Sequence, residues 1–334
     1  MTHRQIIQDT LEFKKTDMKP YWIPIYGDKQ EEITQFLGSD AWKKKILSFI
    51  DGGHSAGMIG EDMPDGRYRD GFGYYTENNG HIMTVTEVAL KEPCLDGYTM
   101  PDPKTVSPWE TIAEHYESMG DCFRICGCCF GFFERGQFIR GVEELLMDMI
   151  ENPQFVHDLF DMYLEFRLGC LEKLIETVPI EGIFDGGDDC DQRGPMMGLP
   201  RWQEFIKPRL KAVIDFAHAK GLPVVAHMCG NVEPLIEDMV EIKLDALESL
   251  QPEPMDLFDI KKRTQGKMAL IGGMGVQQML PFGTPDEVRA GTRKLQELYE
   301  GGGYILGPAK PVMDEVPVEN AIAFLEEAIG EPLA

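Results

Sequence analysis

Short apolar runs alternate with longer amphipathic stretches along the second half of the chain. Each apolar run is brief, which predicts a buried strand, and the stretches between them have the spacing of helices. Repeated strand–helix units imply parallel strands with right-handed crossovers. The predicted strands are 182–184, 223–228, 246–250, 269–271 and 304–306, and the predicted helices are 200–220, 233–242, 256–263, 285–300 and 318–329.

The first half of the chain is less regular. Asn78-Asn79-Gly80 lies between β-prone runs and predicts a hairpin turn. Pro153 suits the first turn of a helix. Together these patterns predict helices over 2–15, 40–49, 142–150 and 153–177, a hairpin within 71–88 and a buried strand over 122–132.

The number and length of the strand–helix units favour an α/β fold of the (β/α)8 TIM-barrel type over an open sheet. No Gly-x-Gly-x-x-Gly motif follows the first strand, which argues against a dinucleotide-binding fold. Gly301-Gly302-Gly303 precedes a strand, so it is predicted to form a turn and not a phosphate-binding loop. We expect residues 1–334 to form a single barrel domain with an N-terminal helical extension.

Composition narrows the classes of partner. The 334 residues are 43% hydrophobic, and no apolar run of about 18 residues occurs, so no membrane span is expected. The net charge of −25 disfavours nucleic-acid binding, because a polyanion repels phosphate groups. The acidic residues are spread over the helices and form either a solvated surface or a docking face for a basic partner. The polar start of the chain does not resemble a signal peptide, and we expect a cytoplasmic location.

The eight cysteines are expected to be reduced thiols, because a chain of this size needs no disulfides for its stability. Cys126-Gly127-Cys128-Cys129 contains a C-x-x-C spacing, but the sequence has no second such pair. Core packing within a strand is therefore favoured there over an iron–sulfur cluster or a structural zinc site.

His227 and Cys229 stand at the end of the strand predicted over 223–228. On an extended chain, residues i and i+2 point to the same side, so the imidazole and the thiolate would face one point. Zinc binds nitrogen and sulfur ligands, and a catalytic zinc keeps one position open for substrate. A buried histidine beside a free core cysteine is the alternative interpretation.

Polar residues also follow the neighbouring predicted strands. In parallel barrels the chemistry takes place at the carboxyl ends of the strands. We therefore expect these side chains to meet on one rim, which favours a functional site over core packing for the H-x-C pair. The strand ends carry Asp185-Gly186-Gly187-Asp188-Asp189-Cys190-Asp191-Gln192-Arg193, Glu248, Gly272-Gly273-Met274 and Leu306-Gly307-Pro308-Ala309-Lys310.

Several segments spread over most of the chain resemble the uroporphyrinogen decarboxylase superfamily. Together they are specific at the level of the superfamily, and the resemblance implies a distorted (β/α)8 barrel. The segments are 98–103 (Tyr-Thr-Met-Pro-Asp-Pro), 141–146 (Gly-Val-Glu-Glu-Leu-Leu), 152–157 (Asn-Pro-Gln-Phe-Val-His), Gly187-Asp188-Asp189, Gln192-Arg193-Gly194, 227–231 (His-Met-Cys-Gly-Asn) and 317–320 (Pro-Val-Glu-Asn).

Two chemistries occur within this superfamily. Tetrapyrrole decarboxylases carry an Arg-Gln-Ala-Gly-Arg-type motif for the substrate carboxylates, and this chain lacks it in the corresponding region, 21–27. They also carry a histidine after the Leu-Gly of the last strand, where this chain has Pro308. Corrinoid-dependent methyltransferases use zinc held by H-x-C and a later ligand, and His227 and Cys229 match the first two ligands.

The resemblance leaves the third zinc ligand open. Methyltransferases that act on coenzyme M place a cysteine in the last strand, and this chain offers no ligand there. Glu248 is the first candidate because it ends the neighbouring strand and carboxylates bind zinc; Cys190 is the second, and an absence of zinc is the third alternative. This departure favours relatives that demethylate methoxylated or similar substrates and load a corrinoid protein.

The resemblance implies that zinc acts as a Lewis acid on the heteroatom that carries the methyl group. In the return direction, zinc would lower the pKa of a thiol. Asp188 and Asp189 are candidates for orienting the substrate or donating a proton, or for supporting the ligands. Gln192, Arg193 and Lys310 are the candidate substrate-binding residues. Arg193 either pairs with a substrate carboxylate or stabilises the acidic loop. Lys310 either pairs with a substrate carboxylate or is a surface lysine.

The sequence contains no Asp-x-His-x-x-Gly cobalt-ligating motif, so the corrinoid is expected to be bound to a partner protein. The predicted function is a methyltransferase that works between a small methylated molecule and a corrinoid-binding protein. Two alternatives stay open, a decarboxylase of the other branch and a non-catalytic member that binds a ligand or a corrinoid partner.

Overall fold

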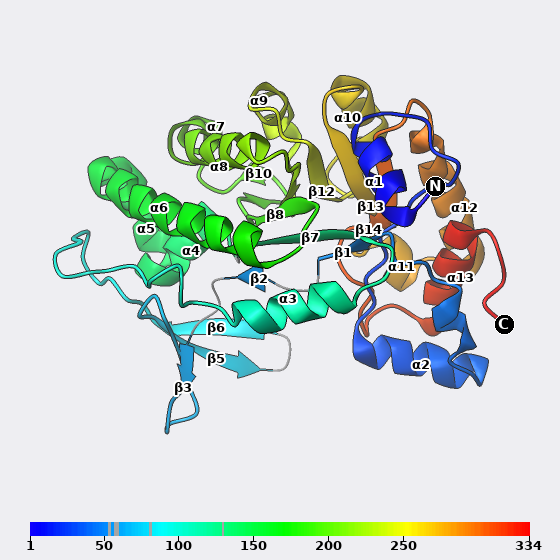
Figure 1. The fold of residues 1–334 in the computed structure, drawn as a ribbon, viewed down its shortest axis with the longest axis horizontal. Coiled ribbons are helices and arrows are strands. Elements are labelled where there is room, and N and C mark those ends of the chain that lie inside the picture. The colour runs from blue at the N-terminus through cyan, green and yellow to red at the C-terminus, as the bar shows by residue number, and fades with distance from the viewer. Residues whose placement is uncertain (53–54, 57–59, 80–81, 129) are drawn as a thin grey trace.

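A curved parallel sheet forms the centre of the computed structural model, which describes residues 1–52, 55–56, 60–79, 82–128 and 130–334. Its strands follow the order β1-β7-β8-β11-β12-β13-β14, and β2 pairs with the end of β7. Helices cover the outside of the sheet, which confirms the distorted (β/α)8 barrel (Figure 1). The strands are β1 Ile50–Asp51, β2 Ser55–Ala56, β7 Phe123–Cys128, β8 Gly182–Gly186, β11 Val224–His227, β12 Ala246–Leu250, β13 Ala269–Met274 and β14 Tyr304–Pro308.

The elements predicted for the second half are confirmed, and each predicted strand there begins within one residue of the observed strand. The helix predicted over 200–220 is interrupted by a π-helical turn at Trp202–Ile206, and the unpredicted α11 precedes α12. The helices are α7 Leu199–Arg201, α8 Lys207–Ala219, α9 Ile236–Glu241, α10 Leu257–Thr264, α11 Met279–Phe282, α12 Pro285–Leu295 and α13 Val318–Ile329.

An N-terminal extension lies beside β14 at the end of the sheet. It begins with α1 (His3–Leu11), which confirms the predicted first helix at shorter length. The following segment bridges to β14 in parallel, through Tyr21 opposite Leu306. The unpredicted helix α2 (Gly27–Leu37) comes next. The helix predicted over 40–49 is wrong, because only a 3₁₀ turn at Ala41–Lys44 forms before the chain enters β1.

An antiparallel sheet is inserted between β2 and β7, and it consists of β3 (Gly60–Asp62), β4 (Tyr68–Asp70), β5 (Tyr75–Asn79) and β6 (Ile82–Glu87). The pairing of β5 with β6 confirms the predicted hairpin, while Gly80 of its predicted turn lies outside the described residues. Buried Arg135, in the helix Phe132–Arg140, links this sheet to the barrel. Its guanidinium donates a hydrogen bond to the Tyr74 hydroxyl at 2.6 Å and pairs with Asp70 at 3.5 Å.

The remaining helices lie on either side of β7 in the sequence. They are α3 Trp109–Ser118, α4 Phe132–Arg140, α5 Val142–Glu151 and α6 Pro153–Thr177. The predicted helices over 142–150 and 153–177 are therefore confirmed, whereas the strand predicted over 122–132 ends at Cys128. No helix in the described part of the chain is long and apolar enough to cross a bilayer.

None of the cysteines whose side chains are described forms a disulfide. Cys126 is fully buried in β7, as expected for core packing. Its predicted C-x-x-C partner, Cys129, lies outside the described residues.

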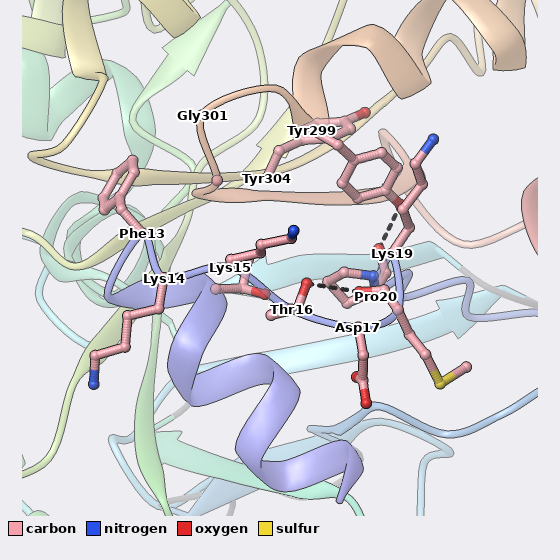
Figure 2. Close-up of a pocket in the computed structure, with 13 residues that line it drawn as sticks. Phe13, Lys14, Lys15, Thr16, Asp17, Lys19, Pro20, Tyr299, Gly301 and Tyr304 are labelled. Carbon is pink, nitrogen blue, oxygen red and sulfur yellow. Dashed lines mark hydrogen bonds between the residues drawn. The ribbon is translucent and has the colours of Figure 1, made fainter. Parts of the chain in front are cut away.

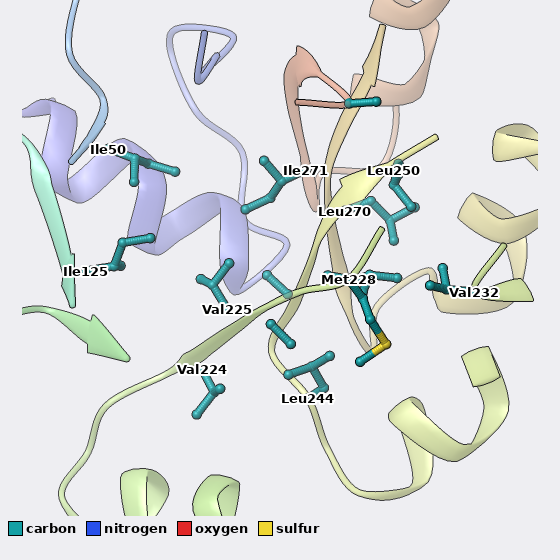
Figure 3. Packing of buried hydrophobic residues seen from close by; sticks show 14 of the residues in the cluster. Ile50, Ile125, Val224, Val225, Met228, Val232, Leu244, Leu250, Leu270 and Ile271 are labelled. Carbon is teal, nitrogen blue, oxygen red and sulfur yellow. The ribbon is translucent and has the colours of Figure 1, made fainter. Parts of the chain in front are cut away.

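Aliphatic side chains from adjacent strands pack together and form part of the hydrophobic core (Figure 3). Burying one such side chain contributes roughly 1.5–3 kcal/mol. The packed core fixes the strands relative to one another and therefore fixes where their carboxyl ends lie. Examples that are at most 1% exposed are Ile125, Val225, Leu250, Leu270 and Ile271.

Gly127 allows β7 and β8 to approach closely. A Cβ at this position would lie 1.7 Å from the carbonyl oxygen of Phe184, a backbone atom that cannot move without disturbing the sheet. We expect Gly127→Ala to lower the free energy of unfolding by at least ~2 kcal/mol. Gly120 precedes the same strand and has no atom within 4 Å of an added Cβ, so Gly120→Ala is the matched control. Equal effects of the two substitutions in urea unfolding would contradict the close approach.

Candidate metal centre

Three potential metal ligands meet at the carboxyl-end rim of the barrel. His227 ends β11, Cys229 follows it, and Asp188 follows β8, the neighbouring strand. Nε2 of His227 lies 3.4 Å from Sγ of Cys229 and 3.6 Å from Oδ1 of Asp188. One ligand atom from each residue lies within 4.8 Å of the other two. The predicted H-x-C pair therefore comes together, and Asp188 completes a group that we call the ligand trio.

Glu248 contacts the other nitrogen of the histidine. Its carboxylate forms a hydrogen bond with Nδ1 of His227, and the two residues face each other in the paired strands β11 and β12. Nδ1 is thereby occupied, while Nε2 faces Cys229 and Asp188. Burial is the largest single influence and favours the neutral imidazole, but the electrostatic and hydrogen-bond contributions of Glu248 and Cys229 together outweigh it and raise the pKa of His227 well above its ordinary value. The structure thus places Glu248, the predicted third ligand, against the ring and outside the trio.

Backbone contacts hold the loop that carries Cys229. The N–H of Cys229 donates to Oδ1 of Asp188 at 3.4 Å, and the N–H of Gly230 donates to Oε1 of buried Gln251 at 2.5 Å. Gly230 has a φ of +82°, and an added Cβ would lie 2.5 Å from the carbonyl oxygen of Asp191. Only glycine fits this position, so the loops after β8 and β11 are tightly joined.

Asp189 and Cys190 are buried beside the trio but do not belong to it. Asp189 accepts a hydrogen bond from the indole N–H of Trp202 at 2.8 Å. Burial raises the pKa of Asp189 to about 6. Cys190 lies in the short strand β9 (Cys190–Asp191), which pairs with β10 (Gly194–Pro195), and burial raises the pKa of its thiol.

The predicted substrate-binding residues lie apart from the trio. Gln192 donates a hydrogen bond at 3.3 Å to the glutamine that holds the Cys229 loop. The side chain of Arg193 is 91% exposed and pairs with Asp191 at 2.9 Å. Lys310 pairs with Glu315 at 3.3 Å. Both cations are therefore engaged with acidic neighbours of their own loops.

Glu134 is an acidic residue near the site that the sequence reasoning missed. It lies in the first turn of α4, where its carboxylate accepts a hydrogen bond from the N–H of Gly131. Burial, reinforced by the charge of Asp188, raises the pKa of Glu134 to about 7. The rule that functional residues follow strand ends would have identified it, because α4 begins shortly after β7 ends.

A cavity of about 780 Å³ extends from His227 and Glu248 into the N-terminal part of the chain. Trp22 and Phe184 meet edge to face with their ring centroids 6.1 Å apart, and the Phe184 ring lies 6.1 Å from the imidazole of His227. The aromatic wall thus leads to the histidine of the trio. The described lining residues are Tyr21, Trp22, Ile23, Pro24, Ile25, Gln30, Ile46, Leu47, Ser48, Phe49, Ile50, Asp51, Gly52, Phe184, His227, Glu248 and Pro311.

A second cavity, of about 520 Å³, lies at the opposite end of the barrel, where β14 begins (Figure 2). Lys14, Lys15 and Lys19 line it, and the ammonium group of Lys19 lies 5.3 Å from the centroid of the Tyr299 ring. None of the predicted site residues lines this cavity. The trio and the lysine-lined cavity are therefore separate features of the fold.

The donor set of the trio fits zinc. Imidazole nitrogen, thiolate sulfur and carboxylate oxygen are the ligand types that zinc accepts in proteins, and catalytic zinc sites use three protein ligands. A ligating histidine usually donates its other N–H to a carboxylate or carbonyl group, and Glu248 stands at that position for His227.

Fold and geometry together define an α/β barrel with potential metal ligands at its carboxyl-end rim. The family model described as uroporphyrinogen decarboxylase (URO-D) matches residues 101–330, and the chain belongs to this family. The resemblance derived from the motifs is thereby confirmed.

Two curated relatives are methyltransferases by name. The methylated-thiol–coenzyme M methyltransferase of Methanosarcina mazei is 23% identical over 195 residues, which are 58% of this chain and 50% of the relative. The methylcobamide:CoM methyltransferase MtaA of Methanosarcina barkeri is 25% identical over 130 residues, 39% of this chain and 36% of the relative. The chain thus spans half or less of the length of these relatives.

A solved structure has the same fold over almost the whole chain. This methyltransferase from Methanosarcina mazei superposes with a TM-score of 0.69 and 17% identity, and the match covers 98% of both chains. The similarity extends to the N-terminal extension, which lies outside the residues matched by the family model.

The raised pKa of Glu134 predicts a stability that depends on pH. The carboxyl group ionises near pH 4.5 in the unfolded chain and near pH 7 in the folded one, so ionisation costs folding free energy as the pH rises through this window. We expect Glu134→Gln to stabilise the metal-free protein by roughly 1–3 kcal/mol at pH 8, with the gain disappearing near pH 4.

Urea unfolding of chelator-treated protein at both pH values measures this difference. The matched control is Glu110→Gln, because Glu110 is exposed in the first turn of α3. A gain that is the same at pH 4 and pH 8 would show that the ionisation of Glu134 is not its cause.

Proposed function

We propose that this protein transfers a methyl group between a small methylated molecule, methoxylated or similar, and the corrinoid of a partner protein, with zinc as a Lewis acid. The single observation that carries the proposal is the convergence of His227, Cys229 and Asp188 at the rim of a barrel of this family. The names of the curated relatives support methyl transfer, and the name of one includes a methylcobamide.

The trio would hold the metal through Nε2 of His227, Sγ of Cys229 and a carboxylate oxygen of Asp188. When bound, zinc polarises the heteroatom that carries the methyl group and makes it a better leaving group. Asp188 takes the place that we predicted for Glu248, because Asp188 faces Nε2 and Glu248 faces Nδ1.

The remaining acidic residues would have supporting roles. Glu248 fixes the orientation of the His227 ring and makes Nε2 the free ligand atom. Asp189 is held by Trp202 and supports the loop that carries Asp188. Glu134, which has a pKa of about 7, would supply or accept a proton at the leaving heteroatom.

Tetrapyrrole decarboxylation is disfavoured by the charges around the cavity. A polycarboxylate substrate needs cationic partners, and Arg193 and Lys310, the predicted ones, do not belong to the described cavity wall. Both already pair with acidic residues of their own loops. We keep the proposal that residues 1–334 act as one barrel domain and that the partner docks at the carboxyl-end rim, where the trio lies.

Replacing a trio residue should remove the metal without unfolding the barrel. We expect Cys229→Ser to lower zinc content well below the ~1 zinc per chain of the parent protein and to abolish methyl transfer. Glu248→Gln should weaken zinc affinity less severely, by about 10–100-fold, because it loosens a ligand without removing one. Metal analysis after dialysis against a chelator measures both.

Cys94→Ser is the matched control for the cysteine substitution, since Cys94 is exposed and free. Full zinc retention in Cys229→Ser would count decisively against the trio. Unchanged zinc affinity in Glu248→Gln would mean that the carboxylate of Glu248 does not support zinc binding by His227.

Activity should depend on an added corrinoid. We expect the purified protein alone to be colourless and inactive, and methyl transfer to appear when a reduced corrinoid protein, or excess free cob(I)alamin, is added with a methylated substrate. The complex between this protein and the corrinoid protein should be transient and should have a small interface, because the corrinoid must leave to pass its methyl group on. Demethylation at an undiminished rate without corrinoid would show that the methyltransferase assignment is wrong.

A further inference from the structure

We infer that the small-molecule substrate of this site is an uncharged methyl ether or thioether with an apolar body, and that anions such as coenzyme M are rejected. The inference rests on the proposed function and narrows its substrate. It sets this chain apart from the two curated relatives, whose names include coenzyme M. It follows from three features of the cavity: its charges, its walls and the metal ligands at its end.

The described cavity wall contains two acidic residues and one histidine, His227, but no lysine or arginine. Asp51 and Glu248 are part of the described wall, and no lysine or arginine is. The residues outside the description are glycine, histidine, methionine, isoleucine and cysteine, so none of them adds a lysine or arginine. A sulfonate or carboxylate would enter a partly desolvated cavity whose described wall offers no lysine or arginine, and whose histidine already pairs with Glu248.

Two basic residues close to the carboxyl ends of the strands are already paired. Arg167, almost fully buried, forms an ion pair with Asp185 of β8. Lys310 pairs with Glu315. The three lysines of the second cavity lie at the other end of the barrel (Figure 2). An anionic substrate would therefore have to break an existing ion pair to obtain a cationic partner.

A quaternary ammonium compound is compatible with the charges of the cavity wall, but a metal ion could not polarise it. Carboxylates and aromatic rings are a suitable environment for such a cation. Its nitrogen, however, has no lone pair, and a metal held by the trio can polarise only an atom that has one. The oxygen of an ether and the sulfur of a thioether both have lone pairs and carry no charge. These two groups satisfy both conditions.

The walls add a preference for an apolar body. Trp22 and Phe184 are partly exposed to the cavity, and their edge-to-face arrangement leads toward the imidazole of His227. The other described lining residues include five aliphatic residues, two prolines and two further aromatic residues, Tyr21 and Phe49. A flat ring that carries a methoxy or methylthio group would pack on this surface while its heteroatom reaches the trio.

The transfer is balanced with a reduced corrinoid as co-reactant. The bond between the methyl carbon and the oxygen or sulfur breaks, and a bond between that carbon and cobalt forms. The Co(I) centre of the partner's corrinoid supplies the electron pair of the new bond and is oxidised to Co(III). The electron pair of the broken bond stays on the heteroatom, which takes up a proton.

The test is binding to the zinc-loaded protein without any corrinoid, measured by isothermal titration calorimetry. 4-Methoxybenzamide and 4-methoxybenzoate have nearly the same shape and differ by one negative charge. We expect the amide to bind at least tenfold more tightly than the carboxylate, and coenzyme M not to bind at 1 mM. Ser48→Arg, which adds a cation to the cavity wall, should improve carboxylate binding about tenfold or more.

Ser39→Arg is the matched control, because Ser39 is exposed and does not line the cavity. Equal or tighter binding of the carboxylate to the parent protein overturns the inference, and so does a failure of the amide to bind. If the amide binds but no methyl group reaches an added reduced corrinoid protein, the proposed function fails while the charge selectivity of the cavity stands.

Discussion

The hydrogen bond between Glu248 and Nδ1 of His227 is the constraint on which the site depends. The two residues face each other because β11 and β12 pair in parallel register, so the sheet itself places the carboxylate beside the ring. The bond fixes the ring and leaves Nε2 for Cys229 and Asp188. Without the ring, the largely buried carboxylate would be a desolvated charge, which is costly.

The site also depends on the close approach of backbone segments around the loop that carries Asp188. Gly131 at the start of α4 lies so near to the loop after β8 that an added Cβ would be 2.6 Å from Cα of Gly187. Gly230 shows the same restriction on the other side of that loop. The loop with Asp188 is therefore held between two backbone segments, and its carboxylate needs little reorganisation to face His227. Rigid placement of this kind is what a metal centre requires of its ligands.

The sequence predicted the barrel, and it predicted that His227 and Cys229 lie together at a strand end, because both features depend on local patterns. Buried parallel strands produce continuous apolar runs, and the β12 prediction coincides with the observed strand. The helix predicted over 40–49 failed because its amphipathic pattern is short and the segment turns to join the sheet as β1. The identity of the third ligand was beyond local patterns. Asp188 and Glu248 both lie near strand ends, and only the pairing register shows which nitrogen each one faces.

The family match and the cavity divide the chain into two parts with different roles. The trio and Glu248 lie within residues 101–330, which the family model matches. Most of the cavity wall comes from residues 21–52, ahead of that match. On the proposed function, the metal chemistry would be set by the part of the chain that defines the family, and the choice of substrate by the N-terminal residues of the cavity wall. Because the described wall carries carboxylates and no arginine or lysine, we infer that it would select partly by excluding anions. On this proposal, changes in residues 21–52 would alter which molecule enters the cavity while the barrel and the ligand trio stay the same.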